Sequence, residues 1–271
     1  MKNLTIYCTT IKYFKVLEKL PIYIHPVGLG DGKFPEKWLT EKVGENISYL
    51  NKYYAEFSMF YWIWKNRISN SEPDDLVGSC QHRYFFLDKK YDKKNYFSIK
   101  SLYSKLLKPY NKILLENDVI QLNPIIFKKK NLLEDFKDVH DKFLLDESLF
   151  FLDKTIAKNF KEHLLQNKFY SHNMFITKVK FFKEYCEIIF PWLEKVLNYC
   201  LQKGICSGYN TRLPAFLAER FSSFWFNQFK NRGLVSMARL GKFFLNDNIN
   251  KFINPLKLPF TFRQFPTIHK Y

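Results

Sequence analysis

Hydrophobic and polar positions alternate along the chain in a way that predicts a mixed α/β fold. Short apolar runs bounded by turn residues are typical of strands, and they occur at residues 4–9, 22–25, 76–80 and 117–122, and after a turn within 169–177. Apolar residues at helical spacing predict helices at residues 52–66, 132–146, 154–166, 181–200 and from 214 onward. Pro191 predicts a break in the fourth of these helices. Such an order favours an α/β domain, whose binding sites lie where strands end.

Residues 44–86 are the stretch in which this pattern most clearly predicts a site. A helix that is aromatic on nearly every side is followed by a buried strand, which leads into a loop with Gln81, His82 and Arg83. The guanidinium of Arg83 suits phosphate oxygens, and a pairing with a nearby carboxylate is the alternative. Glu56 lies on the apolar stripe of the helix. Its carboxylate therefore either lines a cavity or bonds to the backbone or a lysine at the rim.

Other polar residues interrupt apolar segments later in the chain. Asp138 and His140 are two positions apart, so they cannot share one helical face and would act together only at a helix end or in a loop. His172–Asn173 stand where a strand is expected to begin. Glu219–Arg220 interrupt an otherwise apolar helix, as a structural ion pair or as a pair of site residues.

The composition of the chain indicates a negatively charged partner or a lysine-rich surface. With 271 residues, 46% of them hydrophobic, the chain can bury a large core, and its net charge is +17. Such a charge indicates nucleic acid, an anionic membrane or phosphate-bearing substrates as partners, or else a solvated lysine-rich surface. From residue 230 to 271 basic residues alternate with phenylalanines, which suits an anionic bilayer or single-stranded nucleic acid. The sequence thus divides into a domain at 1–229 and a basic, aromatic extension at 230–271.

Cysteine usage and hydropathy bear on the cellular location. The five cysteines are odd in number and no two have C-x-x-C spacing, which argues against a disulfide framework and for a reducing compartment. The first residues lack the apolar core of a signal peptide. No run reaches the ~18 apolar residues of a membrane span. The sequence therefore predicts a cytoplasmic protein, either free or attached to a membrane surface.

Five short motifs, weak singly but fairly specific in this order, resemble one bacterial family. They are ENIS-x-x-N-x-x-Y-x-E-x-x-x-x-Y-W-x-W-K-N, VGSCQHRYF, DVH, HNMFI and FLAERF, at Glu45–Asn66, Val77–Phe85, Asp138–His140, His172–Ile176 and Phe216–Phe221. Together they cover roughly residues 4–226 and resemble the family named domain of unknown function 4422. Members of that family are associated with capsule, exopolysaccharide and lipopolysaccharide synthesis.

The resemblance implies a glycosyltransferase of the GT-A type. The expected fold is a Rossmann-type α/β/α sandwich with a central mixed sheet, followed here by a helical, basic C-terminal extension. The expected reaction moves a sugar from a nucleotide diphosphate donor, such as a UDP-hexose in pyranose or furanose form, to a glycan or lipid-linked glycan. The chain departs from the family pattern His-Tyr-Arg-Arg-Tyr, because Gln81–Phe85 read Gln-His-Arg-Tyr-Phe.

The chemistry of such a transfer suggests roles for the polar residues. The expected donor-binding residues are Thr9, Thr10, Gly28, Asn46, Ser48, Gln81, His82, Arg83, His172 and Asn173, the first five near the base and ribose. The expected catalytic residues are Asp138, His140 and Glu219. Among these and His172, Asp138 is the first choice for the base that takes the acceptor proton.

No metal ligand is assigned. Many GT-A enzymes hold a metal through Asp-x-Asp, and at the corresponding place this chain has Gln81, His82 and Arg83. We expect Arg83 with His82 to neutralise the diphosphate without a strict need for metal, although Mn²⁺ or Mg²⁺ could take part.

A second class of function competes with the enzyme. Charge and aromatic content alone would suit a non-catalytic protein that binds nucleic acid or an anionic membrane. The isolated polar residues Glu56, Arg83, Asp138, His172 and Glu219 lie within apolar stretches or at strand ends, as in a pocket, which favours the enzyme without a nucleic-acid partner. The expected location is then the cytoplasmic face of the inner membrane. A homodimer through the aromatic C-terminal helices is compatible with the sequence, which gives no direct signal for it.

Overall fold

A central β-sheet organises the structure, a computed structural model that describes residues 3–88, 90–91, 95–96, 102–140 and 144–240. Seven strands cross this sheet in the order β11-β7-β10-β4-β1-β2-β3, and β5, β12 and β6 extend it beside β4. A separate two-stranded sheet pairs β8 with β9. The strands are β1 Leu4–Thr10, β2 Ile24–Gly28, β3 Leu39–Thr40, β4 Leu76–Gln81, β5 Tyr84–Phe86, β6 Asn95–Tyr96, β7 Val119–Leu122, β8 Ile125–Ile126, β9 Lys168–Phe169, β10 Phe175–Lys178, β11 Arg232–Val235 and β12 Met237–Leu240.

Strand direction brings several strand ends to one edge of the sheet. The strands β1, β2, β3 and β4 run parallel, and β7 and β11 run the same way, while β10 runs antiparallel between β4 and β7. The carboxyl ends of the parallel strands therefore meet the amino end of β10. In an open α/β sheet this is the edge where ligands bind.

Side chains on both faces of the sheet are buried, as a sandwich requires. On β1, Ile6 and Cys8 belong to one core and Tyr7 to the other, because successive residues of a strand point to opposite faces. Helices α2, α8 and α9 cover the Tyr7 face, and α4 packs on the opposite face. The described chain is thus a Rossmann-type α/β/α sandwich with a mixed sheet, as predicted. The helices are α1 Asn51–Tyr54, α2 Phe57–Asn66, α4 Lys112–Glu116, α5 Leu132–Val139, α6 Leu144–Ser148, α7 Lys154–Leu164, α8 Val179–Gln202 and α9 Leu213–Asn227.

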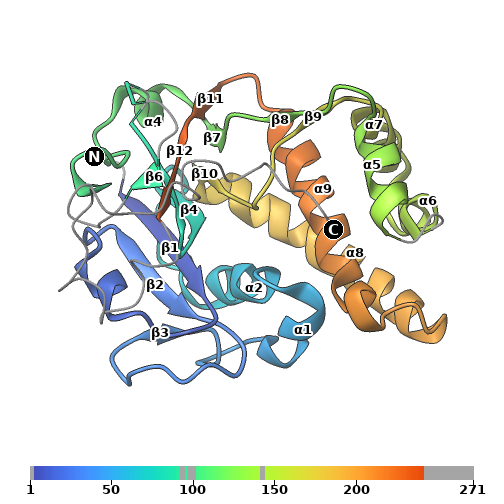
Figure 1. The fold of residues 1–271 in the computed structure, drawn as a ribbon, viewed down its shortest axis with the longest axis horizontal. Helices are drawn as coiled ribbons and strands as arrows, with labels where there is room; N and C mark the ends of the chain where they lie inside the picture. Colours follow the sequence, from blue (N-terminus) through green and yellow to red (C-terminus); the bar gives the residue numbers. More distant parts are fainter. Residues whose placement is uncertain (1–2, 89, 92–94, 97–101, 141–143, 241–271) are drawn as a thin grey trace, which may run out of the picture.

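Helices α5, α6 and α7 form a group of their own at one end of the molecule, beyond α9 (Figure 1). The chain leaves the sheet after β7, builds β8 and these helices, and returns through β9 to β10. Phe160 of α7 anchors the group, since its ring lies 5.3 Å from that of Phe221 and 5.3 Å from that of Phe224 on α9. This excursion brings α5 against the side of α9.

Two of the predicted helices are interrupted. The predicted helix at 52–66 is divided into α1 and α2 at Ala55, whose φ is +48°. The side-chain amide of Asn51 donates to the carbonyl of Ala55 at 2.9 Å and stabilises the break. The predicted helix at 132–146 ends with Val139, after which His140 is extended.

The predicted break at Pro191 is wrong, because Pro191 lies inside α8, a continuous helix of 24 residues. Proline removes one backbone hydrogen bond from a helix. Both Pro191 and Glu187, whose carbonyl loses its donor, are exposed, so water can bind that carbonyl. The neighbours Phe190, Trp192 and Leu193 are buried and hold both halves in one core. Although α8 is long, no helix in the described ranges combines the length and apolar character needed to cross a membrane.

The sheet extends past the predicted domain boundary at residue 229. Strand β11 pairs with β7, and β12 pairs with β5 and β6. The first part of the predicted extension, residues 232–240, is therefore two strands of the sheet and is not helical. The rest of that extension, residues 241–271, lies outside the described residues.

Candidate active site

The predicted donor residues of β1, β2 and β4 lie together at the carboxyl edge of the sheet. Thr10 is paired with Gly28, and Thr9 with Gln81. Both threonines are buried, and their hydroxyls donate to the carbonyls of Cys80 and Lys12. The backbone amide of His82 donates to the carbonyl of Thr9 at 2.9 Å. These bonds fix the turn in which the chain passes from β4 into the polar loop.

His172 and Asn173 join this edge from the other direction, because β10 begins at Phe175 opposite β4. Both have left-handed backbone conformations, with φ of +74° and +50°. Gln81 donates through its amide to the carbonyl of His172 at 3.2 Å. The ring of His172 stacks on that of Tyr84, with centroids 4.9 Å apart. Non-glycine residues adopt such conformations at a cost that the surrounding contacts must offset, and they often mark functional sites.

Glu56 holds the second residue of this turn. Its Oε1 accepts a hydrogen bond from the side-chain amide of Asn173 at 2.9 Å. Burial raises the pKa of the Glu56 carboxyl, and the nearby negative charge of Glu219 acts in the same direction, while the bond from Asn173 opposes them. Glu56, at the start of α2, thus stabilises the turn through its hydrogen bond with Asn173.

A cavity of about 430 Å³ opens beside His172, between the α5 group and α9. It brings together five residues that the sequence singled out, namely Asp138, His140, His172, Glu219 and Arg220. Its walls also contain Phe127, Lys130, Asp135, Val139, Phe169, Ser171, Tyr209 and Phe216. The catalytic candidates therefore share one pocket, and His172 connects that pocket with the strand edge.

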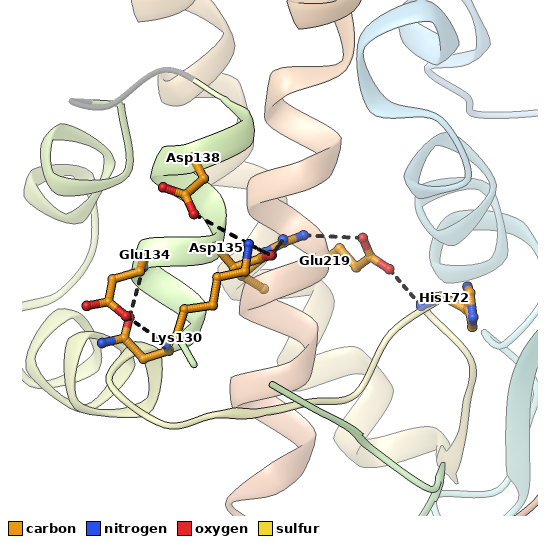
Figure 2. A network of polar contacts seen from close by, with 8 residues as sticks. Lys130, Glu134, Asp135, Asp138, His172 and Glu219 are labelled. Atoms are coloured by element: carbon orange, nitrogen blue, oxygen red, sulfur yellow. Dashed lines mark hydrogen bonds and ion pairs between the residues drawn. The ribbon is translucent and has the colours of Figure 1, made fainter. Parts of the chain in front are cut away.

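Charged side chains in the cavity form one chain of contacts (Figure 2). Glu219 on α9 accepts the backbone amide of His172 through Oε1 at 2.6 Å, and its Oε2 lies 3.6 Å from the guanidinium of Arg220. Arg220 forms an ion pair with Asp135 on α5 at 2.7 Å. Lys130 completes the network at 2.8 Å from Asp135 and 3.5 Å from Asp138.

Arg220 is nearly enclosed, with 7% of its side chain exposed. Its guanidinium lies over the ring of Phe169, 4.4 Å from the centroid. A buried cation requires a paired anion, which Asp135 supplies. The Glu219–Arg220 couple, for which the sequence left two interpretations, is therefore both an ion-pair network and part of the cavity wall.

His140 follows the last residue of α5. A capping box of Asn131 and Glu134 fixes the other end of this helix, its start. The imidazole stacks on the ring of Phe216, with centroids 4.4 Å apart. Burial, together with the positive charge of Arg220, lowers the pKa of His140 to about 4. The ring is therefore neutral near pH 7.

The loop after β4 carries the predicted phosphate-binding pair. Burial and the charge of Arg83 lower the pKa of His82 to about 4, so His82 is neutral near pH 7. The guanidinium of Arg83 lies 5.6 Å from the ring centroid of Tyr84, and its Nε is buried without a hydrogen-bond partner among the described residues. The positive charge of this loop therefore resides on Arg83.

Asn46 and Ser48 lie in a different loop, the one before α1, and are hydrogen-bonded to each other. The amide of Asn46 donates to the carbonyls of Lys42 and Gly44, while its oxygen accepts from the amide and hydroxyl of Ser48. These bonds shape the segment that leads into α1. Gly28 is also a structural position, since a Cβ there would lie 2.4 Å from the ring of Phe34.

The cavity also contains residues to which the sequence assigned no role, among them Lys130, Asp135, Tyr209 and Phe216. Asp135 precedes Asp138 by three positions, which places both on one helical face and could have revealed it. Lys130 comes just before the N-cap of α5. Tyr209 and Phe216 reach the cavity from the other side, and no local spacing relates them to α5.

Whether a divalent cation takes part in the site stays a prediction. No group of three or more His, Cys, Asp or Glu side chains in that part of the chain could hold a metal ion. Mg²⁺ and Ca²⁺ prefer carboxylate and carbonyl oxygens. The loop after β4 presents an amide, a neutral imidazole and a guanidinium in place of the carboxylates of an Asp-x-Asp motif.

Comparisons with known proteins agree with this architecture. The chain superimposes on the apo structure of the bifunctional glycosyltransferase WbbM with a TM-score of 0.72 and 18% identity, covering 89% of this chain and 46% of that chain. The chain thus spans less than half the length of WbbM, and at this identity the likeness establishes the fold, which is GT-A-like as expected. No curated protein sequence matches significantly. The profile of the family described as domain of unknown function (DUF4422) matches residues 5–231, so the chain belongs to that family.

Proposed function

We propose that the protein is a glycosyltransferase that moves a hexose from a nucleoside diphosphate donor, with UDP as the first candidate, to a glycan acceptor. The observation that carries the proposal is the turn at His172. Its carbonyl accepts from Gln81 at the strand edge, and its amide donates to Glu219 in the cavity. A donor at the strand edge and an acceptor in the cavity would then meet at one point. The fold shared with WbbM supports the same reaction class.

In this proposal Arg83 stabilises the leaving group. Negative charge develops on the diphosphate as its bond to the sugar breaks, and a fixed cation in a partly buried site stabilises that charge strongly. Arg83 carries the charge of the loop, and His82 contributes a neutral hydrogen bond. A divalent ion is then not strictly required for transfer.

Glu219 is the base in this proposal, in place of Asp138. In a single displacement, the acceptor oxygen bonds to the anomeric carbon while the bond from that carbon to the diphosphate oxygen breaks. The electron pair leaves with the nucleoside diphosphate, and the hydroxyl proton passes to a carboxylate. Asp138 has 65% of its side chain exposed and contacts Lys130, whereas Glu219 is 19% exposed and contacts the turn at His172.

The cellular setting belongs to the same proposal. A family associated with surface polysaccharides and a chain with a net charge of +17 are compatible with capsule or lipopolysaccharide synthesis at the cytoplasmic face of an anionic membrane. Basic residues attract anionic lipid at a distance of about a Debye length. A flotation assay with anionic and neutral vesicles tests the membrane attachment separately. Equal recovery of the protein with both kinds of vesicle would contradict it.

A thermal-shift screen tests the donor site directly. A ligand that binds the folded state raises its apparent stability, so we expect UDP or a UDP-hexose to raise Tm in the presence of excess chelator. A shift that needs Mn²⁺ would retain the enzyme and reject the role of Arg83 without metal. No shift with any nucleotide sugar, together with a salt-dependent shift with oligonucleotides, would replace the enzyme with a nucleic-acid-binding protein.

A further inference from the structure

One wall of the cavity is built from three aromatic rings. His140 ends α5, Tyr209 comes from the 3₁₀ turn Gly208–Arg212, and Phe216 lies on the first turns of α9. The ring of Tyr209 is 5.4 Å from that of Phe216 and 5.8 Å from that of His140, nearly parallel to the latter at 6°. Tyr209 remains 51% exposed. The wall therefore offers flat apolar surface to whatever enters the cavity.

The cavity also has a polar, slightly acidic part. Three carboxylates, those of Asp135, Asp138 and Glu219, face the cations of Lys130 and Arg220. Both cations already form ion pairs with Asp135, at 2.8 and 2.7 Å. The set therefore carries one net negative charge. Each cation already has a carboxylate partner, and Nε of Arg220 is buried without a hydrogen-bond partner among the described residues. A phosphate placed here would meet a net like charge and would compete with Asp135 for both cations, which is unfavourable.

His140 adds a hydrogen-bonding group that is not used elsewhere. Its Nδ1 is buried and has no hydrogen-bond partner in the described ranges. A buried polar atom without a partner costs free energy that a ligand can recover. A neutral imidazole can either donate to or accept from a hydroxyl group, so the atom suits an uncharged, hydroxyl-bearing ligand.

We propose that this cavity binds the acceptor as a neutral sugar ring, and that the enzyme extends an existing glycan and does not transfer to a lipid phosphate. A sugar ring has an apolar face that can pack on Tyr209 and Phe216, and hydroxyls that the carboxylates accept as strong, charge-assisted hydrogen bonds. The acceptor hydroxyl then lies beside Glu219. This inference rests on the proposed glycosyltransferase function and narrows its acceptor.

A transfer assay distinguishes the two acceptor classes. The full chain is incubated with the nucleotide sugar that gives the largest thermal shift, and with either a panel of methyl hexosides or a polyprenyl phosphate in detergent. We expect labelled sugar on a methyl hexoside and none on the polyprenyl phosphate. Transfer to the polyprenyl phosphate alone would overturn the inference while retaining the glycosyltransferase. No thermal shift with any nucleotide and no transfer would overturn both.

Binding of the acceptor is tested independently of turnover. Saturation-transfer NMR with the methyl hexosides should show contact with the protein, and that signal should fall in Tyr209→Ala and Phe216→Ala. Loss of one ring contact weakens such binding by about two- to tenfold. Both variants should keep the nucleotide-induced thermal shift, which shows that they fold.

Tyr110→Ala is the matched control, because Tyr110 is 72% exposed and is not among the residues that line the cavity. It should leave the saturation-transfer signal unchanged. An equal loss of signal in Tyr110→Ala and Tyr209→Ala, or a full signal in both cavity variants, would show that the hexosides bind elsewhere and would overturn the inference.

Discussion

At the scale of single residues, His172 couples the two halves of the site. Its backbone bonds to Gln81 on one side and to Glu219 on the other, and its ring stacks on Tyr84. The left-handed conformation is held in place by these contacts and by Glu56 through Asn173. A small movement of Glu219 would therefore displace His172 and Gln81 at the strand edge, where the donor is proposed to bind.

Glu219→Gln tests the base at this scale. Glutamine can still accept the amide of His172, but it cannot take up a proton, so the local fold should persist while transfer slows. We expect kcat to fall by about 10²- to 10⁴-fold, the usual contribution of general base catalysis. Turnover is measured with labelled nucleotide sugar, and far-UV circular dichroism with thermal unfolding confirms that the variant is folded.

Asp138→Asn is the comparison for that experiment, because the more exposed Asp138 was the first choice from the sequence. We expect it to reduce kcat by less than about threefold, as removal of one surface ion pair with Lys130 should have a small effect. A large loss in Asp138→Asn with nearly normal turnover in Glu219→Gln would reverse the assignment and restore the original choice.

The residues of the site were partly visible in the sequence. Asp138, His140 and Glu219 stood out because polar groups interrupt apolar segments, and the structure places them in one cavity. Asp135 could have been added from its spacing to Asp138. Tyr209 could not, because it reaches α5 only through the packing of α9 against the inserted helices.

At the scale of elements, the apolar runs predicted β1, β2, β4, β7 and β10, whereas the other strands and the helix breaks were not predicted. Periodicity reports which face of a helix is buried, and that face continues from α1 to α2 and through Pro191 in α8. The break at Ala55 depends on the bond from Asn51 and on the turn of the chain toward the sheet. Such tertiary causes leave little local trace in the sequence.

Ala55→Gly should stabilise the protein, contrary to the usual effect of glycine. Ala55 has φ of +48° and ψ of −130°, a conformation that L-residues with a Cβ adopt only with strain. Relief of that strain should outweigh the greater entropy of glycine in the unfolded chain. We expect the free energy of unfolding, measured by urea titration, to rise by about 1 kcal/mol.

Ala157→Gly supplies the control with the opposite sign. Ala157 lies inside α7 with an ordinary helical hydrogen bond to Asp153. Glycine there should lower the free energy of unfolding by about 0.5–1 kcal/mol. If both variants are destabilised to the same extent, the backbone at Ala55 is not strained.

At the scale of the whole molecule, the sequence predicted the sandwich but not where its sheet ends. The alternation of strands and helices sufficed for an α/β domain, because buried strands leave continuous apolar runs, and the sandwich came from the resemblance to the family. Strands β11 and β12 escaped notice since they lie in a segment whose basic and aromatic composition suggested an extension. Pairing of β11 with β7 is a contact between distant segments, which composition does not report.

Buried histidines should make the fold sensitive to acid. Burial lowers the pKa of His82, His140 and His163 to about 4, against about 6.5 when unfolded. The folded state thus binds fewer protons between these values, and stability present above pH 6.5 is lost as pH falls toward 4. Each histidine contributes a slope of up to about 1.4 kcal/mol per pH unit. Glu41 and Glu56, with raised pKa values, oppose this trend.

His163→Gln isolates one of these contributions in the core, where the ring contacts Ser223 at 3.3 Å. Glutamine keeps a polar partner for Ser223 but does not titrate. Urea unfolding at pH 7.5, 6.0 and 5.0 should therefore show a smaller loss of stability in the variant than in the parent, by about 1 kcal/mol or more over this range. The two carboxyl groups affect both proteins equally and cancel. Identical pH slopes would mean that His163 titrates normally and is not shielded by the core.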